Sequence, residues 1–268
     1  MAVHERYTHG HHESVLRSHQ WRTAENSAAY LIPHLFPGAR LLDVGSGPGT
    51  ITVDLARLVA PGDVIGVDSA PGIVADANGL AVDNGLQNLT FAVGNAYALD
   101  FESHTFDIVH VHQLLHHLAD PVAALREARR VLKPGGILAV REVDYGGTIW
   151  APPSAGLSSW LSVFEDVLRS DAGDPHAGRS LKKWVLDAGF VDPASSASVW
   201  CFASDAEREW WGGSWAVRAT ESDFAERAIE TGHAQLADLR AMSHAWREWV
   251  DAPDGWFLMP HGEIIARA

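Results

Sequence analysis

The sequence is poor in cysteine and in positive charge. Cys201 is the only cysteine among 268 residues, so the chain forms no internal disulfide and no cysteine-based zinc site. Asp and Glu number 34 against 20 Lys and Arg, a net charge of −14 that is unsuited to a nucleic-acid backbone. No apolar run is long enough to span a membrane, and the first residues lack the apolar stretch of a signal peptide. We therefore expect a cytoplasmic protein with no nucleic-acid partner and no membrane span.

Histidine and tryptophan, by contrast, are abundant. The chain has 15 histidines and 11 tryptophans, and Trp21 is the only tryptophan before Trp150. An apolar fraction of 47% supports a sizeable core, and the length suits one large domain or two small ones. Because no internal repeat or low-complexity linker divides the chain, we expect a single domain.

Strand-like and helix-like segments alternate between residues 39 and 144. Short apolar runs typical of buried strands are "ARLLDVG", "DVIGVD", "LTFAVGNA", "FDIVHVHQ" and "GILAVREVD". Apolar residues at helical spacing predict helices over residues 50–59, 72–84 and 121–132. Continuous apolar strands that alternate with helices indicate a parallel sheet covered by helices on both faces.

The alternation stops after Tyr145. An inserted helix is predicted within "APPSAGLSSWLSVFEDVLRS", and two or three tryptophan-rich helices lie between residues 205 and 251. Between these segments, "GRSLKKWVLDAGF" returns to the helical pattern and "SSASVWCFA" fits a sixth strand. A last strand is predicted in "GWFLMPHGEIIARA". The pattern indicates an α/β fold with helical insertions.

The stretch "LLDVGSGPGT" places Gly45, Gly47 and Gly49 between a strand and a helix. Glycine lets the backbone approach a ligand closely and adopt positive φ, so this turn is suited to a nucleotide-bearing ligand. The spacing is G-x-G-x-G, not the G-x-G-x-x-G of dinucleotide sites, and Asp43 precedes the first glycine by two residues. A carboxylate there favours a ligand with a positive ammonium or sulfonium group over a pyrophosphate.

"LLDVGSGPGT" resembles the first motif of the class I S-adenosylmethionine (SAM) dependent methyltransferases, in the type 11 subgroup with the ubiquinone/menaquinone C-methyltransferases. The resemblance covers residues 39–144 and extends more weakly to the sixth and seventh strands. Further similar segments follow in order: "IGVDSA", "GNAYALDF", "FDIVHVHQLLHHLADP" and "RVLKPGGILAVREVD". The resemblance implies a Rossmann-like α/β fold with SAM as cofactor. It also implies a seven-stranded, mostly parallel sheet whose last strand is antiparallel.

The resemblance implies contacts to each part of SAM. The implied cofactor-binding residues of the sheet region are Asp43, Gly45, Ser46, Gly47, Asp68, Ser69, Asn95, Ala96, His112 and Gln113. Asp43 helps to hold the ammonium group, and Asp68 accepts from the ribose hydroxyls. Asn95 borders adenine at a position where the family usually has an aspartate. His112, expected directly after the fourth strand, lies beside the methionine end.

In similar methyltransferases a segment like residues 1–38 forms helices that close over SAM. We expect Tyr7 to stack or hydrogen-bond near the sulfonium, whose charge favours an aromatic face, and to belong to the catalytic set. Arg22 is suited to pair with the methionine carboxylate. A structural or surface role is the alternative for both residues.

Two histidine clusters raise separate questions. Neighbouring histidines in residues 9–12 do not face one another well, and no acid-histidine motif accompanies them, so we expect no metal site. His116 and His117 are candidates for a base that accepts a proton from a phenol, hydroxyl or acidic carbon, and the sequence does not distinguish them. Alternatively, "LHHL" packs before a helix that Asp120 caps ahead of Pro121, and transfer needs no base.

Two further features belong to the acceptor side. Glu142 and Asp144 end the fifth strand, where they contact substrate or face solvent. The tryptophans of the inserted segments line a cavity for an apolar or aromatic acceptor, or pack the helices onto the sheet. These are Trp150, Trp160, Trp210, Trp211, Trp215, Trp246 and Trp249.

These features predict a methyltransferase that moves the methyl group of SAM to a small, apolar or aromatic molecule, with O- or C-methylation favoured. The alternatives are a SAM-binding enzyme of another reaction, such as a cyclisation, and a non-catalytic SAM-binding regulatory or scaffold subunit. A homodimer is an open alternative to a monomer. The expected parts of the domain are an N-terminal lid (1–38), a SAM-binding core (39–148), substrate-cap insertions (149–175 and 204–252) and segments that complete the sheet (176–203 and 253–268).

Overall fold

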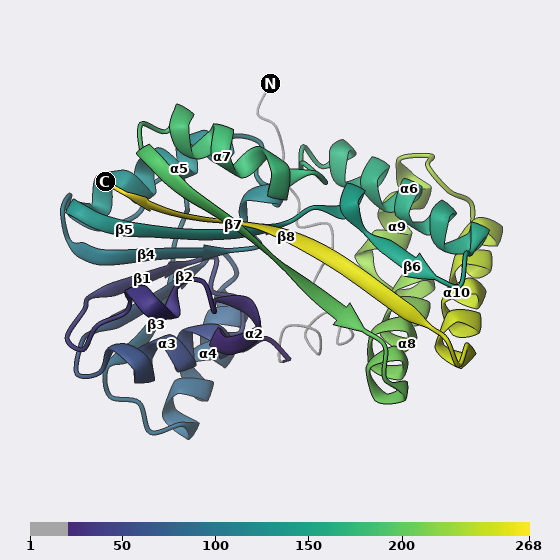
Figure 1. Ribbon diagram of the computed structural model, residues 1–268, viewed down its shortest axis with the longest axis horizontal. Coiled ribbons are helices and arrows are strands. Elements are labelled where there is room, and N and C mark those ends of the chain that lie inside the picture. Colours follow the sequence, from purple (N-terminus) through teal and green to yellow (C-terminus); the bar gives the residue numbers. More distant parts are fainter. Residues whose placement is uncertain (1–20) are drawn as a thin grey trace.

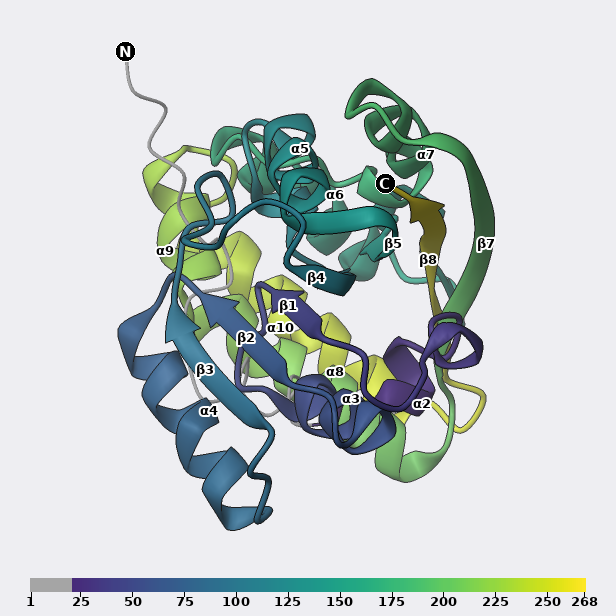
Figure 2. The ribbon, with the colours of Figure 1, turned by 90° about the vertical axis from the view of Figure 1, so that its left-hand side faces the viewer.

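Eight strands form the sheet of the computed structural model, which describes residues 21–268 (Figure 1). The strands are β1 Leu41–Val44, β2 Val64–Asp68, β3 Leu89–Val93, β4 Phe106–His112, β5 Leu132–Val143, β6 Ile149–Ala151, β7 Val191–Phe202 and β8 Trp256–Arg267. Their order is β3-β2-β1-β4-β5-β8-β6, and β7 also pairs with β8. Figure 2 shows β3 and β7 on opposite sides of the molecule.

The predicted strand directions are confirmed. Strands β1 to β5 pair in parallel, and β8 is antiparallel to β5, β6 and β7. The expected number of seven strands is wrong, because the short β6 pairs with residues 256–258 at the start of β8. The segment after β5 was expected to lie outside the sheet. However, β8 extends past the end of β5, and this part of β8 pairs with β6.

Helices cover both faces of the parallel strands, as their continuous apolar sequences predict. On one face lie α2 Ala24–Ser27, α3 Thr50–Val59 and α4 Pro71–Asp83. On the other lie α5 Pro121–Val131 and α7 Ala177–Asp187. The predicted ends of α3 hold, and those of α4 and α5 hold within one residue. The α5 cap is confirmed, since the Asp120 carboxylate accepts from the Ala123 N–H at 2.9 Å.

The remaining helices form a cap at one end of the sheet (Figure 1). They are α6 Ala155–Ser170, α8 Asp205–Glu221, α9 Asp223–Glu230 and α10 Leu236–Asp251. Trp160 on α6 meets Trp215 on α8 and Trp246 on α10 edge to face, with ring centroids 4.6 and 4.8 Å apart. Such pairs contribute about 0.5–1.5 kcal/mol each beyond the area they bury. Packing therefore explains most of the tryptophans in the insertions.

Candidate active site

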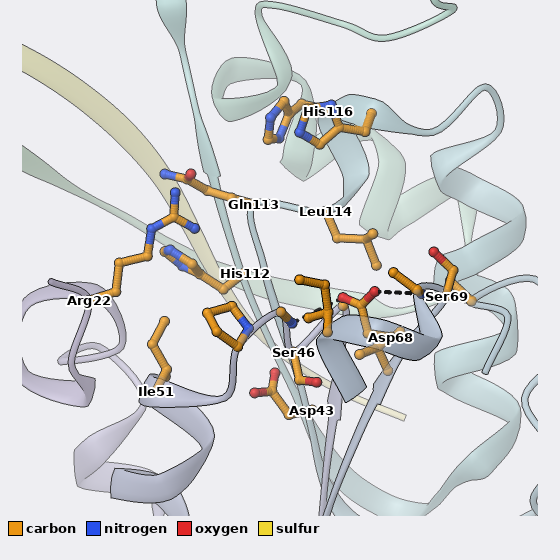
Figure 3. A pocket seen from close by; sticks show the side chains of 18 of the residues that line it. Arg22, Asp43, Ser46, Ile51, Asp68, Ser69, His112, Gln113, Leu114 and His116 are labelled. Atoms are coloured by element: carbon orange, nitrogen blue, oxygen red, sulfur yellow. Dashed lines mark hydrogen bonds between the residues drawn. The ribbon is translucent and has the colours of Figure 1, made fainter. Parts of the chain in front are cut away.

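A cavity of about 720 Å³ lies at the carboxyl ends of β1, β2, β3 and β4, where ligands of open α/β sheets bind. Every residue predicted to bind the cofactor or to act as the base, within the described part of the chain, lines it. These residues are Arg22, Asp43, Gly45, Ser46, Gly47, Asp68, Ser69, Asn95, Ala96, His112, Gln113, His116 and His117. Figure 3 shows several of them around the cavity. Tyr7, the other predicted residue, lies outside the described residues.

The glycine loop has a conformation that requires glycine. Gly45, Gly47 and Gly49 have φ of 74°, 54° and 86°, in the left-handed region. A Cβ on Gly49 would lie 2.5 Å from Cζ of Phe91, far inside contact distance. The Gly47 N–H donates to the Asp68 carboxylate at 3.1 Å, which ties the loop to the end of β2. The loop thus presents bare backbone to the cavity.

Two carboxylates flank this loop in different ways. Asp43 is buried, and its oxygens bond to the Thr52 hydroxyl at 2.6 Å and to Nδ1 of His110 at 2.8 Å. Asp43 therefore lends negative charge to the cavity wall while its main hydrogen bonds go to protein groups. Asp68 accepts one backbone N–H on each oxygen, from Gly47 at 3.1 Å and from Ala70 at 3.0 Å. Each Asp68 oxygen keeps a lone pair for a ligand hydroxyl.

Beyond β3, the Asn95 side chain closes a turn. Its Oδ1 accepts from the Tyr97 N–H at 2.9 Å, and Asn95 pairs with Ala98 in an isolated bridge. The side chain is exposed at the cavity edge. An amide oxygen that already accepts one N–H retains one lone pair, so the predicted contact to adenine depends on that second position.

Arg22 and His112 reach the cavity from different parts of the chain, Arg22 from the segment before α2 and His112 from β4, and lie near each other in Figure 3. The Arg22 guanidinium lies 5.3 Å from the ring centroid of Trp200. His112 is the last residue of β4, so its expected position directly after the strand is wrong by one residue. Burial lowers the pKa of His112 well below its usual value, and the positive charge of Arg141 adds to this effect. His112 is therefore a neutral imidazole, and no described residue hydrogen-bonds to either ring nitrogen.

Glu142 neither faces solvent nor lines the cavity, so both expectations for this residue are wrong. Its side chain is fully buried and accepts from the N–H groups of Leu114 at 2.9 Å and Leu115 at 2.7 Å. Its second oxygen lies 2.6 Å from Nδ1 of His116. Glu142 thus holds the 3-10 turn η2, Leu115–His117, against the end of β5.

Asp144 also lies outside the cavity lining. Its carboxylate pairs with both nitrogens of the Arg179 fork, at 2.6 and 2.7 Å. The side chain of Arg179 is more than half exposed, so solvent screens this pair. Asp144 thus ties α7 to the end of β5 and has no contact with the site.

Burial also shifts the pKa values of the Glu142–His116 pair. It raises the pKa of Glu142 to about 8, against the lowering effect of the Leu115 and Leu114 N–H groups. It lowers the pKa of His116 to about 3, so the imidazole is neutral near pH 7. An ionised Glu142 opposes this lowering, because a negative charge next to the ring stabilises the imidazolium. The basicity of His116 therefore depends on the charge of Glu142.

The cap forms the other end of the cavity. Trp211, Trp215 and Arg218 line it from α8, and Tyr145, Trp200 and Met259 line it from the sheet and the turn after β5. Trp211 and Trp215 belong to the insertions singled out in the sequence. Tyr145, Trp200 and Met259 were missed, because nothing in their local sequence shows that β7, β8 and η3 (Tyr145–Gly147) reach the cavity. Arg218, on α8, was not singled out within its insertion. The wall is aromatic, with one buried guanidinium.

The family model described as "Methyltransferase domain" matches residues 35–171. The chain is 35% identical over 267 residues to "Uncharacterized methyltransferase C1B3.06c" of Schizosaccharomyces pombe. This match covers 97% of this chain and 95% of the relative. The chain belongs to the class I SAM-dependent methyltransferases. Its cofactor is SAM, as the motifs predicted.

Other relatives of this methyltransferase match over shorter lengths. A "Ubiquinone biosynthesis O-methyltransferase" of Cereibacter sphaeroides is 40% identical over 112 residues, 40% of this chain and 42% of the relative. A "Demethylmenaquinone methyltransferase" of Beutenbergia cavernae is 34% identical over 152 residues, 56% of this chain and 60% of the relative. The solved structure of the YcgJ protein from Bacillus subtilis has the same fold, with a TM-score of 0.61 and 20% identity over 91% of this chain and 98% of that one.

The cavity of this methyltransferase fits SAM. Gly45 and Gly47 line the cavity without side chains, and the buried Ser46 hydroxyl between them has no hydrogen-bond partner among residues 21–268. The Asp68 oxygens suit a sugar with neighbouring hydroxyls, and the Asp43 charge suits a cation. The volume of about 720 Å³ lies within the range of about 300–1,000 Å³ for small-molecule sites.

Metal and membrane sites are also constrained. Residues 21–268 contain no group of three His, Cys, Asp or Glu side chains placed to hold a metal ion. The histidines of residues 9–12 lie outside the described residues. Among the helices of the described part, none combines the length and apolar character needed to cross a bilayer.

Proposed function

We propose that this methyltransferase transfers the methyl group of SAM to an oxygen or carbon atom of a small apolar or aromatic molecule. The observation that carries the proposal is a single cavity that joins the glycine loop to the aromatic wall of the cap. A cofactor in the loop and an acceptor against the wall would therefore share one cavity. The net charge of −14 favours a small molecule over a nucleic acid as substrate. We propose a cytoplasmic location.

At the cofactor end, the ribose, adenine and methionine portions of SAM each have a candidate partner in the chain. Asp68 accepts from the ribose hydroxyls, and Asn95 and Ala96 border the adenine. The backbone of Gly45 and Gly47 receives the methionine portion. Bound SAM supplies a methyl group already activated by the positive sulfonium, so the protein has mainly to position the acceptor.

The charged groups around the methionine portion and the N-terminal segment complete this site. Asp43 supplies negative charge near the ammonium group, and Arg22 pairs with the carboxylate. His112 and Gln113 flank the same portion from the end of β4. Tyr7, the predicted aromatic neighbour of the sulfonium, lies outside the described residues, as do residues 1–20 of the expected lid (1–38).

At the acceptor end, the cap supplies an apolar surface. Trp200, Trp211, Trp215 and Tyr145 line the cavity. Aromatic side chains bind planar or apolar molecules and exclude water from the reacting atoms. The similar proteins named for ubiquinone biosynthesis and demethylmenaquinone support a small-molecule acceptor of this kind.

The decisive experiment measures binding and turnover separately. Calorimetry with SAM and with S-adenosylhomocysteine (SAH) should detect binding of both, and absence of heat with both would overturn the proposal. Release of SAH is then measured with naphthols, cyclic diketones and apolar amines as acceptors. Release with the first two groups supports O- or C-methylation. If SAM binds but no acceptor leads to release of SAH, the result would favour a SAM-dependent reaction other than methyl transfer, or a non-catalytic role.

A further inference from the structure

His116 and Glu142 form a buried pair beside the cavity. His116 lies in η2 directly after β4, and Glu142 lies next to the end of the neighbouring strand β5. Their side chains are buried, and Nδ1 of His116 is 2.6 Å from the Glu142 carboxylate. His116 lines the cavity and Glu142 does not. The histidine is thus placed between the acid and any ligand in the cavity.

The position of the imidazole is set by the hydrogen bonds of Glu142. One Glu142 oxygen accepts from two successive backbone N–H groups, those of Leu114 and Leu115. The other oxygen is directed at Nδ1 of His116. The opposite ring nitrogen, Nε2, takes part in none of the hydrogen bonds found between residues 21–268. A carboxylate that holds Nδ1–H leaves Nε2 with a lone pair, which is the form of histidine that accepts a proton.

We propose that His116 is the general base for methyl transfer to a hydroxyl group, and that Glu142 is the residue that positions it. The assignment rests on the proposed methyl transfer and narrows it to acceptors with an ionisable hydroxyl, such as phenols. It also separates His116 from His117, which the sequence left equivalent. The distinguishing observation is the hydrogen bond to Glu142.

The proposed step conserves atoms and charge. The acceptor hydroxyl gives its proton to Nε2 of His116, and an oxygen lone pair forms the new bond to the methyl carbon. The bond from that carbon to sulfur breaks, and its electron pair stays on sulfur, so that neutral SAH results. The ionised Glu142 stabilises the imidazolium until its proton passes to solvent.

Other charged and titratable groups face this pair. The ring of His117 lies 3.8 Å from that of His116, and that of Tyr145 lies 6.3 Å away. The groups that act electrostatically on the pair are Arg22, His117, Arg141 and Asp174. Because Glu142 must be ionised for His116 to be basic, methyl transfer to a weakly acidic hydroxyl should rise with pH through about 8.

The substitution Glu142→Gln tests the positioning role with little change of shape. The amide oxygen can still accept from Leu114 and Leu115, so the turn keeps its hydrogen bonds. The amide nitrogen, however, then donates to Nδ1 of His116, which moves the ring proton to Nε2 and removes the base. Heteronuclear NMR of the imidazole nitrogens should show His116 protonated at Nδ1 in the wild type near pH 9 and at Nε2 in Glu142→Gln.

The kinetic test uses naphthols of graded acidity as acceptors. For the least acidic naphthol, His116→Gln and Glu142→Gln should lower kcat by about 100-fold with SAM affinity unchanged, as expected for loss of a general base. For naphthols already ionised at the assay pH, the loss should shrink to less than about threefold. Asp144→Asn is the matched control, because this acid lies two residues away and outside the cavity lining. It should leave the pH profile unchanged.

The possible failures are distinguishable. If none of the acceptors leads to release of SAH, the proposed methyl transfer is wrong. The tautomer of His116 measured by NMR then still decides whether Glu142 positions this histidine. Equal losses for acidic and weakly acidic naphthols would show a structural role for the pair and overturn the inference. Release of SAH with cyclic diketones or amines but no naphthol would also overturn it.

Discussion

Replacing Asp68 by asparagine should weaken SAM binding with a magnitude set by its hydrogen bonds. Asp68 accepts from Gly47 and Ala70 through separate oxygens, which leaves one lone pair on each for ribose. Hydrogen bonds to a charged group contribute about 1.5–3 kcal/mol each. Asparagine keeps one neutral acceptor and loses the other, so we expect a loss of about 2 kcal/mol, or about 30-fold in Kd. Its amide nitrogen also leaves one of the two backbone N–H groups without an acceptor.

The assay is calorimetry with SAH and with an analogue that lacks one ribose hydroxyl. Wild type should discriminate between these ligands, and Asp68→Asn should largely lose that discrimination, which separates the ribose contact from a general weakening of the loop. Asp63→Asn is the control, because Asp63 is exposed before the opposite end of β2. An unchanged Kd for SAH in Asp68→Asn would refute the placement of ribose at this carboxylate.

Four further predictions concern other parts of the molecule. Gly49→Ala places a Cβ 2.5 Å from Phe91 at positive φ and should lower the free energy of unfolding by about 2 kcal/mol in denaturant titrations; an unchanged value contradicts the close approach. Arg22→Met should raise the Kd of SAM but not of methylthioadenosine, which has no carboxylate, and equal effects would dismiss the pairing. Trp211→Ala should widen the range of acceptors in the SAH-release assay; an unchanged range would exclude Trp211 from the acceptor wall. Finally, burial raises the pKa of Glu142 to about 8, so its protonation stabilises the fold at low pH and this contribution falls as pH rises to about 8. Relative to wild type, Glu142→Gln should therefore gain thermal stability from pH 5 to 8, and a constant difference in melting temperature would argue against the raised pKa.

Local sequence patterns predicted the cofactor half of the molecule well. The strand and helix boundaries around "LLDVGSGPGT" follow from apolar spacing and from glycine, which alone tolerates the positive φ at residue 49 beside Phe91. Asp43 near the end of β1 and Asp68 at the end of β2 lie at the same sheet edge because parallel strands share one direction. These features depend on a few residues close together in the chain.

The acceptor half depends on residues far apart in the chain. Trp200 on β7 and Met259 on β8 reach the cavity because β8 is antiparallel to β5 and to β7, and no local signal specifies that pairing. The short β6 joins the sheet for the same reason. Glu142 is an acidic residue near a strand end, where local sequence predicts exposure to solvent. Only the turn that follows β4 buries it.

The sequence by itself therefore determined the α/β architecture, the glycine loop and the cofactor class, because those features arise from short-range backbone preferences and from motifs of adjacent residues. Only the tertiary structure decided which tryptophans line the cavity and which histidine is hydrogen-bonded to Glu142. Both depend on packing between separate elements, which brings together side chains that no local pattern links, such as His116 and Glu142, 26 residues apart.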